Sequence, residues 1–246
     1  MKYVDKLLPV TDYGDGDNRF FDNDSEELFK RNLKQLGSSW EYYDKNITYK
    51  KNTDGYRTME FDKIPWDKTV VMFGCSNMFG VGLAIKDTIP TQFTALTGIP
   101  AINLGVPGSS LQYSMYNSAI FKKLYPKPRA VVVDIPDASR CALFLPEGDS
   151  FKPVHCGAWT EDMSGLGKSW RRFDSNVIMH QRFIRLCIKQ IWGDIPYTDF
   201  TVFPSNQRVI PECKFIKQED YARDLVHPGT KTCKGIAEHV ASKLSL

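Results

Sequence analysis

One stretch, residues 70–82, constrains the fold of this chain more than any other. It reads Val-Val-Met-Phe-Gly-Cys-Ser-Asn-Met-Phe-Gly-Val-Gly. Its first four residues are apolar and mostly β-branched or aromatic, which predicts a buried strand that ends at Gly74. Ser76 follows almost at once, and a hydroxyl at that place lies at the rim of the sheet, where open α/β sheets bind ligands. A plain strand–turn connection, in which Ser76 caps a helix, fits the same residues.

A second stretch, near the C-terminus, reads Arg-Asp-Leu-Val-His-Pro-Gly over residues 223–229. Asp224 lies three residues before His227, so on one turn both side chains can face the same side. The carboxylate can then hold one imidazole nitrogen and leave the other free to take a proton from a serine. On its own, His227 fits equally well as a surface residue at a turn marked by the Pro-Gly that follows.

The early serine, the late Asp-x-x-His and a glycine-rich turn at 103–110, after a second predicted strand, together resemble the SGNH (GDSL-like) hydrolase family. That resemblance implies an α/β/α fold and an esterase or lipase activity, in many members on acyl groups carried by carbohydrates. Residues 52–57, Asn-Thr-Asp-Gly-Tyr-Arg, are similar to the lead-in before the first strand of many SGNH-like proteins. The resemblance covers about residue 52 to the C-terminus.

The resemblance implies a role for each matched residue. Ser76 is the predicted nucleophile, His227 the base that activates it, and Asp224 the acid that orients the imidazole. The backbone N–H groups of Ser76 and Gly108 are the predicted oxyanion donors. Gly108 also fits as a simple turn glycine. Cys75 stands where the family has an aspartate, and we expect its side chain to point inward and pack in the core.

The third block of the family, Gly-x-Asn-Asp, is not matched. The aligned residues 136–140 read Pro-Asp-Ala-Ser-Arg and supply no asparagine. Because loss of one oxyanion donor costs about 10²–10³ in rate, a substitute is needed for full activity. The candidates are Ser139, Arg140, Asn77 and Asn206.

The rhythm of strands and helices predicts right-handed βαβ units and a parallel sheet. We therefore predict a three-layer α/β/α sandwich of SGNH or flavodoxin-like type over residues 51–246, preceded by an aromatic-rich N-terminal arm over 1–50. A short helix capped by Asp24 or Ser25 is expected in the arm, and 141–172 is expected to be a long loop or insertion. The further predicted strands are 99–104, 130–134, 199–203 and 209–216, and the main helices begin near residues 88, 110, 174 and 230.

Composition excludes several classes of function. The net charge of +3 argues neither for nor against nucleic acid, and because no Lys/Arg run marks a phosphate-binding patch we predict no nucleic-acid partner. The six cysteines form no CxxC pair and the four histidines show no metal spacing, which predicts free thiols in a reducing compartment and no metal site. The triad that the resemblance implies needs neither a metal nor an organic cofactor. No signal peptide and no apolar run of ~18 residues is evident, so we expect no membrane partner and a cytoplasmic or virion-associated protein.

The sequence favours a serine esterase with a small ester or acylated carbohydrate as substrate, and a carbohydrate O-deacetylase is the specific expectation. Two alternatives remain. The fold can serve as a catalytically weak or inactive binding or structural protein, for example in a phage-like virion, or the same triad can catalyse acyl transfer to a sugar hydroxyl. The oligomeric state stays open.

Overall fold

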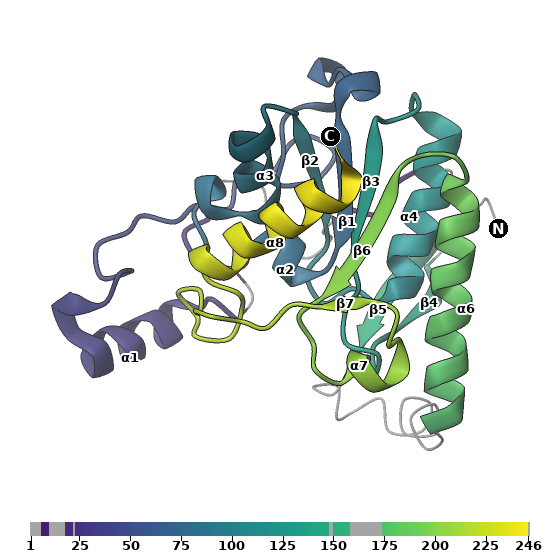
Figure 1. Ribbon diagram of the computed structural model, residues 1–246. Coiled ribbons are helices and arrows are strands. Elements are labelled where there is room, and N and C mark those ends of the chain that lie inside the picture. Colours follow the sequence, from purple (N-terminus) through teal and green to yellow (C-terminus); the bar gives the residue numbers. More distant parts are fainter. Residues whose placement is uncertain (1–5, 10–17, 22, 148–149, 158–173, 246) are drawn as a thin grey trace.

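A computed structural model describes residues 6–9, 18–21, 23–147, 150–157 and 174–245 of the chain. Its centre is a five-stranded parallel sheet in the order β2-β1-β3-β6-β7 (Figure 1). The strands are β1 (Val70–Gly74), β2 (Ala101–Gly105), β3 (Ala130–Asp134), β6 (Tyr197–Thr201) and β7 (Lys214–Phe215).

Helices cover both faces of the sheet, and the predicted three-layer α/β/α class is thereby confirmed. Helices α3 (Ile89–Thr97) and α8 (Thr230–Leu244) pack against each other on one face, and α4 (Leu111–Leu124) and α6 (Asp174–Trp192) do so on the other (Figure 1). The remaining helices are α1 (Glu26–Leu36), α2 (Ser76–Phe79) and α7 (Asn206–Val209).

The two central strands are buried along their whole length, as their apolar sequences require. Strand β1 reads VVMFG and β3 reads AVVVD, and every residue of both is buried. β1 lies between β2 and β3, with Val70 opposite Ala101 on one side and Ala130 on the other. The C-terminal end of β1, and with it Ser76, therefore lies at the rim of the sheet between the ends of β2 and β3.

The region 141–172, expected to be a long loop or insertion, contains regular secondary structure. Strand β4 (Cys141–Glu147) pairs with β5 (Ser150–Cys156) as an antiparallel hairpin. Sequence reading missed the hairpin because prolines and charged residues interrupt any alternation of apolar and polar residues in it. Residues 158–173 lie outside the described part of the chain. The fourth sheet strand also begins two residues earlier than predicted, at Tyr197.

The N-terminal residues contribute to the same hydrophobic core as the sheet. Phe21 and Tyr49 are buried, and the Phe21 ring stacks on Phe79 of α2 with 4.8 Å between ring centres. Ser25, one of the two predicted caps, accepts a hydrogen bond from Leu28 N–H at 3.1 Å and begins α1. The aromatic residues before position 50 thus pack beneath the turn that carries Ser76.

Candidate active site

Ser76 begins α2 two residues after the end of β1 and is only 2% exposed. Gly74 is required at the end of the strand, because a Cβ there would lie 2.6 Å from the Cβ of Asp134. The sharp strand-to-helix turn therefore depends on a position without a side chain. This geometry is what the sequence predicted for a serine at the rim of the sheet.

Arg57 of the lead-in motif holds the far end of α2. Its buried guanidinium donates hydrogen bonds to the carbonyls of Gly80 and Leu83, each at 2.7 Å, and to the carbonyl of Phe79 at 3.2 Å. A cation at a helix C-terminus also interacts favourably with the helix dipole. The lead-in resemblance thus has a physical basis, since its arginine fixes the short helix that carries Ser76.

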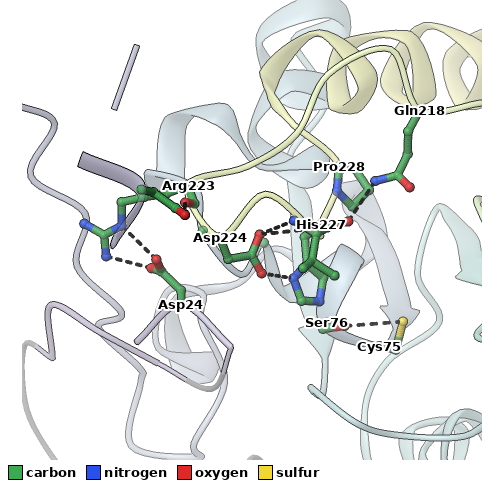
Figure 2. Close-up of polar contacts among 12 residues, drawn as sticks. Asp24, Cys75, Ser76, Gln218, Arg223, Asp224, His227 and Pro228 are labelled. Carbon is green, nitrogen blue, oxygen red and sulfur yellow. Dashed lines mark hydrogen bonds and ion pairs between the residues drawn. The ribbon is translucent and has the colours of Figure 1, made fainter. Parts of the chain in front are cut away.

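Asp224 and His227 form a buried pair. His227 Nδ1 is hydrogen-bonded to Asp224 Oδ2, while Oδ1 accepts the backbone N–H groups of Val226 and His227 at 3.0 Å each (Figure 2). Leu225 adopts a left-handed conformation, with φ at 59°, which closes the turn between them. Because Nδ1 is occupied by the acid, Nε2 is the imidazole nitrogen left to accept a proton.

The electrostatics of Asp224 favour its ionised form. Burial alone raises the pKa of the carboxyl group, but the hydrogen bonds and charge interaction from His227 and the two backbone N–H groups outweigh it. The net result is a pKa of Asp224 below its ordinary value. The carboxylate is therefore available to stabilise a positive charge on the imidazole.

The loop that follows α2 is in direct contact with the loop that carries this pair. Arg223 N–H donates to the carbonyl of Gly82 at 3.1 Å, and a Cβ on Gly82 would lie 2.7 Å from the Cβ of Ala222. In Figure 2 the His227 ring extends from Asp224 in the direction of Ser76. Residues about 150 positions apart in the chain are thus gathered at one end of β1.

Cys75 is buried in the core, and it also makes polar contacts with Asp134. Its N–H and its thiol both donate to Asp134 Oδ2, at 3.4 and 3.3 Å, and the Ser76 hydroxyl lies 4.0 Å from its sulfur. Burial, and then the nearby Asp134 charge, raise the pKa of the Cys75 thiol to about 12. The thiol stays protonated at neutral pH, so Cys75 is not the nucleophile.

Asp134 is a fully buried carboxylic acid beside the nucleophile turn, and sequence reasoning missed it. Burial raises its pKa to about 6, although the bonds from Cys75 and the charge of Arg140 oppose the shift. The family's aspartate before the serine is replaced by Cys75, and here a carboxylate from the end of β3 contacts the same turn. An acidic residue closing the apolar run Ala-Val-Val-Val was the available signal.

The turn after β2 is tied to the end of β1. Ser109 donates its hydroxyl to the carbonyl of Gly74 at 3.2 Å, and Gly108 beside it has a φ of 73°. A left-handed φ of this kind favours glycine. Gly108 therefore lies in a turn that is anchored directly to the strand leading to Ser76.

The four candidate substitutes for the missing asparagine differ in how their side chains are used. Asn206 donates to the carbonyl of Pro136 and to Thr201 and accepts from Ala138 N–H, so its amide is fixed within the third-block loop. Ser139 donates its hydroxyl to Asp137 at 2.5 Å.

Arg140 and Asn77 are placed differently. The Arg140 guanidinium lies over the ring of Phe203, 5.2 Å from its centre, and its charge acts on Cys75 and Asp134. Asn77 is 3% exposed, and its Nδ2 is a buried donor without a hydrogen-bond partner among the described residues. A buried amide donor normally has an acceptor, so the unpaired Nδ2 of Asn77, in the residue next to Ser76, is an exception among the described residues.

Two kinds of feature are absent among the residues that the structure describes. Among them, no three His, Cys, Asp or Glu side chains gather in a way that fits a metal ion. Their helices also include none with the length and apolar character needed to cross a bilayer.

Comparison with known proteins gives matches at the level of structure only. No protein-family model and no curated protein matches the chain. A protein assigned as a GDSL-like lipase from Bacteroides ovatus is 12% identical with a TM-score of 0.47, and the match covers 74% of this chain and 55% of that one.

Two further solved structures have comparable coverage. An acetyl xylan esterase from the rumen bacterium Butyrivibrio proteoclasticus is 12% identical with a TM-score of 0.48, over 74% of this chain and 66% of that one. The SGNH-hydrolase family esterase AlinE4 is 15% identical with a TM-score of 0.36, over 74% of this chain and 75% of that one. The solved structures that the chain matches thus include the GDSL- and SGNH-type proteins that its sequence resembles.

Proposed function

We propose that the protein is a serine esterase in which Ser76, His227 and Asp224 act as one proton-transfer unit. The observation that carries the proposal is the buried Asp224–His227 pair, on a loop that touches the loop following Ser76. The bonded Nδ1 leaves Nε2 to act as the base. A serine hydroxyl is a weak nucleophile by itself, and such a base is what activates it.

In the proposed reaction, Ser76 Oγ attacks the ester carbonyl while His227 Nε2 takes the hydroxyl proton. The imidazolium then gives that proton to the leaving alcohol, and an acyl-enzyme remains on Ser76. Water, deprotonated by His227, attacks the acyl-enzyme, and the imidazolium returns that proton to Ser76 Oγ as the acid is released. Asp224 stabilises the imidazolium in both halves without accepting the proton, in keeping with its lowered pKa. No cofactor is needed.

Backbone N–H groups of Ser76 and Gly108 and the side chain of Asn77 are the oxyanion donors that we propose. Asn77 takes the place of the missing third-block asparagine because its amide is buried and has no other acceptor in the described part of the chain. Ser139 and Arg140 are the weaker candidates, since Ser139 is bonded to Asp137 and Arg140 lies on Phe203.

The substrate class that we propose is a small acyl ester, with an acetylated carbohydrate as the first to test. This follows from the family that the sequence resembles. An inactive binding protein is the second candidate, and one observation favours it. The third-block loop holds no free amide at Asn206, so catalysis depends on a donor from elsewhere.

Labelling by a fluorophosphonate probe separates the two candidates. We expect the folded protein to be labelled and the label to be found on Ser76 by mass spectrometry of the peptides. Ser76→Ala should remove both labelling and hydrolysis of p-nitrophenyl acetate, while Ser242→Ala, on the exposed face of α8, should retain both. Absence of labelling in folded wild-type protein would refute the esterase proposal. Product analysis with added alcohol then distinguishes hydrolysis from acyl transfer.

A further inference from the structure

The segment before residue 50 contributes a buried charge to the loop that carries Asp224. Asp24 forms a two-point ion pair with Arg223, with Nε to Oδ1 at 2.8 Å and Nη2 to Oδ2 at 2.6 Å. Each of the two side chains is 1% exposed. Arg223 is the residue directly before Asp224, so the pair fixes the chain at the start of the Asp224–His227 turn.

Further residues from the segment before residue 50 also contact Arg223. Its guanidinium lies over the rings of Phe20 and Phe29, at 4.9 and 5.0 Å from their centres. It also donates to the carbonyl of Arg19 at 2.6 Å, and its own carbonyl accepts from Asn32 Nδ2 at 3.1 Å. Backbone and side chain of Arg223 are therefore both positioned by residues far from it in the sequence.

The same carboxylate also reaches the loop after the nucleophile. Tyr49 donates its hydroxyl to Asp24, and the Tyr49 oxygen accepts Gly82 N–H at 2.7 Å. Gly82 in turn accepts from Arg223 N–H through its carbonyl at 3.1 Å. A closed ring of contacts thus joins Asp24, Tyr49, Gly82 and Arg223, and both proposed catalytic loops pass through it.

The turn that depends on this ring is a strained one. Leu225 is a non-glycine residue in the left-handed region, and such a conformation persists only where the surroundings fix it. Figure 2 shows the Asp24–Arg223 pair on the side of Asp224 opposite to His227. The ion pair therefore fixes the turn on the side that faces away from the His227 imidazole.

We propose that Asp24 is a positioning residue that sets the orientation of the Asp224–His227 pair through Arg223. This inference rests on the proposed function of that pair. It also assigns a role to the N-terminal segment, which lies outside the family resemblance. A misplacement of about 1 Å at a reacting group can cost about 100-fold in rate, so a support of this kind can matter although it touches no substrate.

The test uses a double variant, because Asp24→Asn alone would leave a buried guanidinium unpaired and unfold the chain more easily. Asp24→Leu with Arg223→Met removes both charges together and keeps apolar volume. The matched control is Asp199→Leu with Arg185→Met, which removes a two-point Arg–Asp pair of similar geometry, 2.7 and 2.9 Å, between β6 and α6.

We expect the Asp24/Arg223 variant to lose about 10- to 100-fold in kcat toward p-nitrophenyl acetate with KM changed less than about threefold. The control should keep kcat within about threefold of wild type at a comparable melting temperature. In NMR spectra, the low-field Nδ1–H signal of His227 should weaken or shift in the Asp24/Arg223 variant and stay unchanged in the control.

Each outcome decides something. A folded Asp24/Arg223 variant with wild-type kcat and an unchanged His227 signal would overturn the inference and leave Asp24 a purely structural residue. A wild-type protein without Ser76-dependent hydrolysis would refute the proposed function instead, and the His227 signal would still test the positioning role. Equal loss of kcat in the control would also count against the inference, because any broken ion pair would then produce the effect.

Discussion

Replacing Asp134 with asparagine is expected to stabilise the fold by an amount that grows as pH rises from about 4 to about 6. Asp134 is 0% exposed at the end of β3, and its carboxylate accepts the N–H and thiol of Cys75. Burial raises its pKa to about 6 from a reference value of 3.8. The charged form is therefore disfavoured in the fold, and asparagine offers an oxygen acceptor of the same shape without the charge.

The magnitude follows from the pKa difference. A raised carboxyl pKa contributes stability that is fully present below the unfolded pKa and is lost as pH rises through the folded value. The difference of about 2 pKa units corresponds to a change of about 3 kcal/mol in the free energy of unfolding. About 2 kcal/mol of this change occurs between pH 4.5 and pH 8. For a chain of this length, 3 kcal/mol corresponds to about 6–12 °C in melting temperature.

Urea unfolding of wild type and Asp134→Asn at several pH values between 4.5 and 8 measures the effect. Other titrating groups cancel when the two free energies of unfolding are subtracted at each pH. The variant's advantage should grow by about 2 kcal/mol across this range, with most of the change below about pH 6 and a plateau above it. A difference that is independent of pH would refute the reasoning, because the buried carboxyl would then not change its charge in this window.

Cys75→Ala provides a second check on the same cause. The thiol hydrogen bond lowers the pKa of Asp134, against the larger effect of burial. Removing the thiol should therefore raise the pKa of Asp134 in the fold, so that the stability difference levels off at a higher pH. A plateau that begins at the same pH, or at a lower one, would show that the Cys75 thiol does not act on the Asp134 charge.

Three further predictions concern the proposed site. Asp224→Asn should lower kcat by up to about 10⁴-fold, because the amide would hold the imidazole in the wrong tautomer and cannot stabilise its cation; steady-state kinetics would show this. Asn77→Ala should lower kcat by about 10²–10³ if its buried amide meets the oxyanion, and an unchanged kcat would remove Asn77 from the mechanism. Gly82→Ala should lower the melting temperature and kcat together, since its φ is 77° and the new methyl would lie 2.7 Å from the Cβ of Ala222. A fully active, equally stable Gly82→Ala protein would show that the two loops are not held this closely.

Local signals in the sequence were enough to locate the central sheet and the closing helix. The apolar runs of β1 and β3 are buried at every position, and α8 begins and ends where the Thr230–Leu244 pattern predicted. Continuous apolar strands leave little choice of place in a parallel sheet, because both faces must be covered. The Asp224–His227 contact was equally accessible, since it spans three residues on one turn.

Contacts between distant residues were beyond the reach of the same reasoning. The Asp24–Arg223 pair joins positions 199 residues apart. Neither the residue types nor the flanking sequence distinguish these two residues from charged residues on the surface. The sequence predicts Asp24 or Ser25 as a helix cap, and Ser25 is the cap. The buried acid Asp134 was read as the last residue of a strand, because its environment is set by the β1 turn 59 positions earlier.

The two buried carboxyl groups near Ser76 have opposite electrostatic tendencies, and their environments explain why. Asp224 accepts three hydrogen bonds within its own turn, from His227 twice and from Val226, so its pKa is lowered and it stays ionised. Asp134 is equally buried, and there the effect of burial outweighs the N–H and thiol of Cys75, at 3.4 and 3.3 Å, and the backbone N–H of Met78, so its pKa rises to about 6. Carboxyl groups whose environments move their pKa values apart commonly serve different roles in one site. On this argument, Asp224 is suited to stabilise a cation throughout the proposed catalysis, whereas Asp134 holds the nucleophile turn through Cys75 and changes its charge near pH 6.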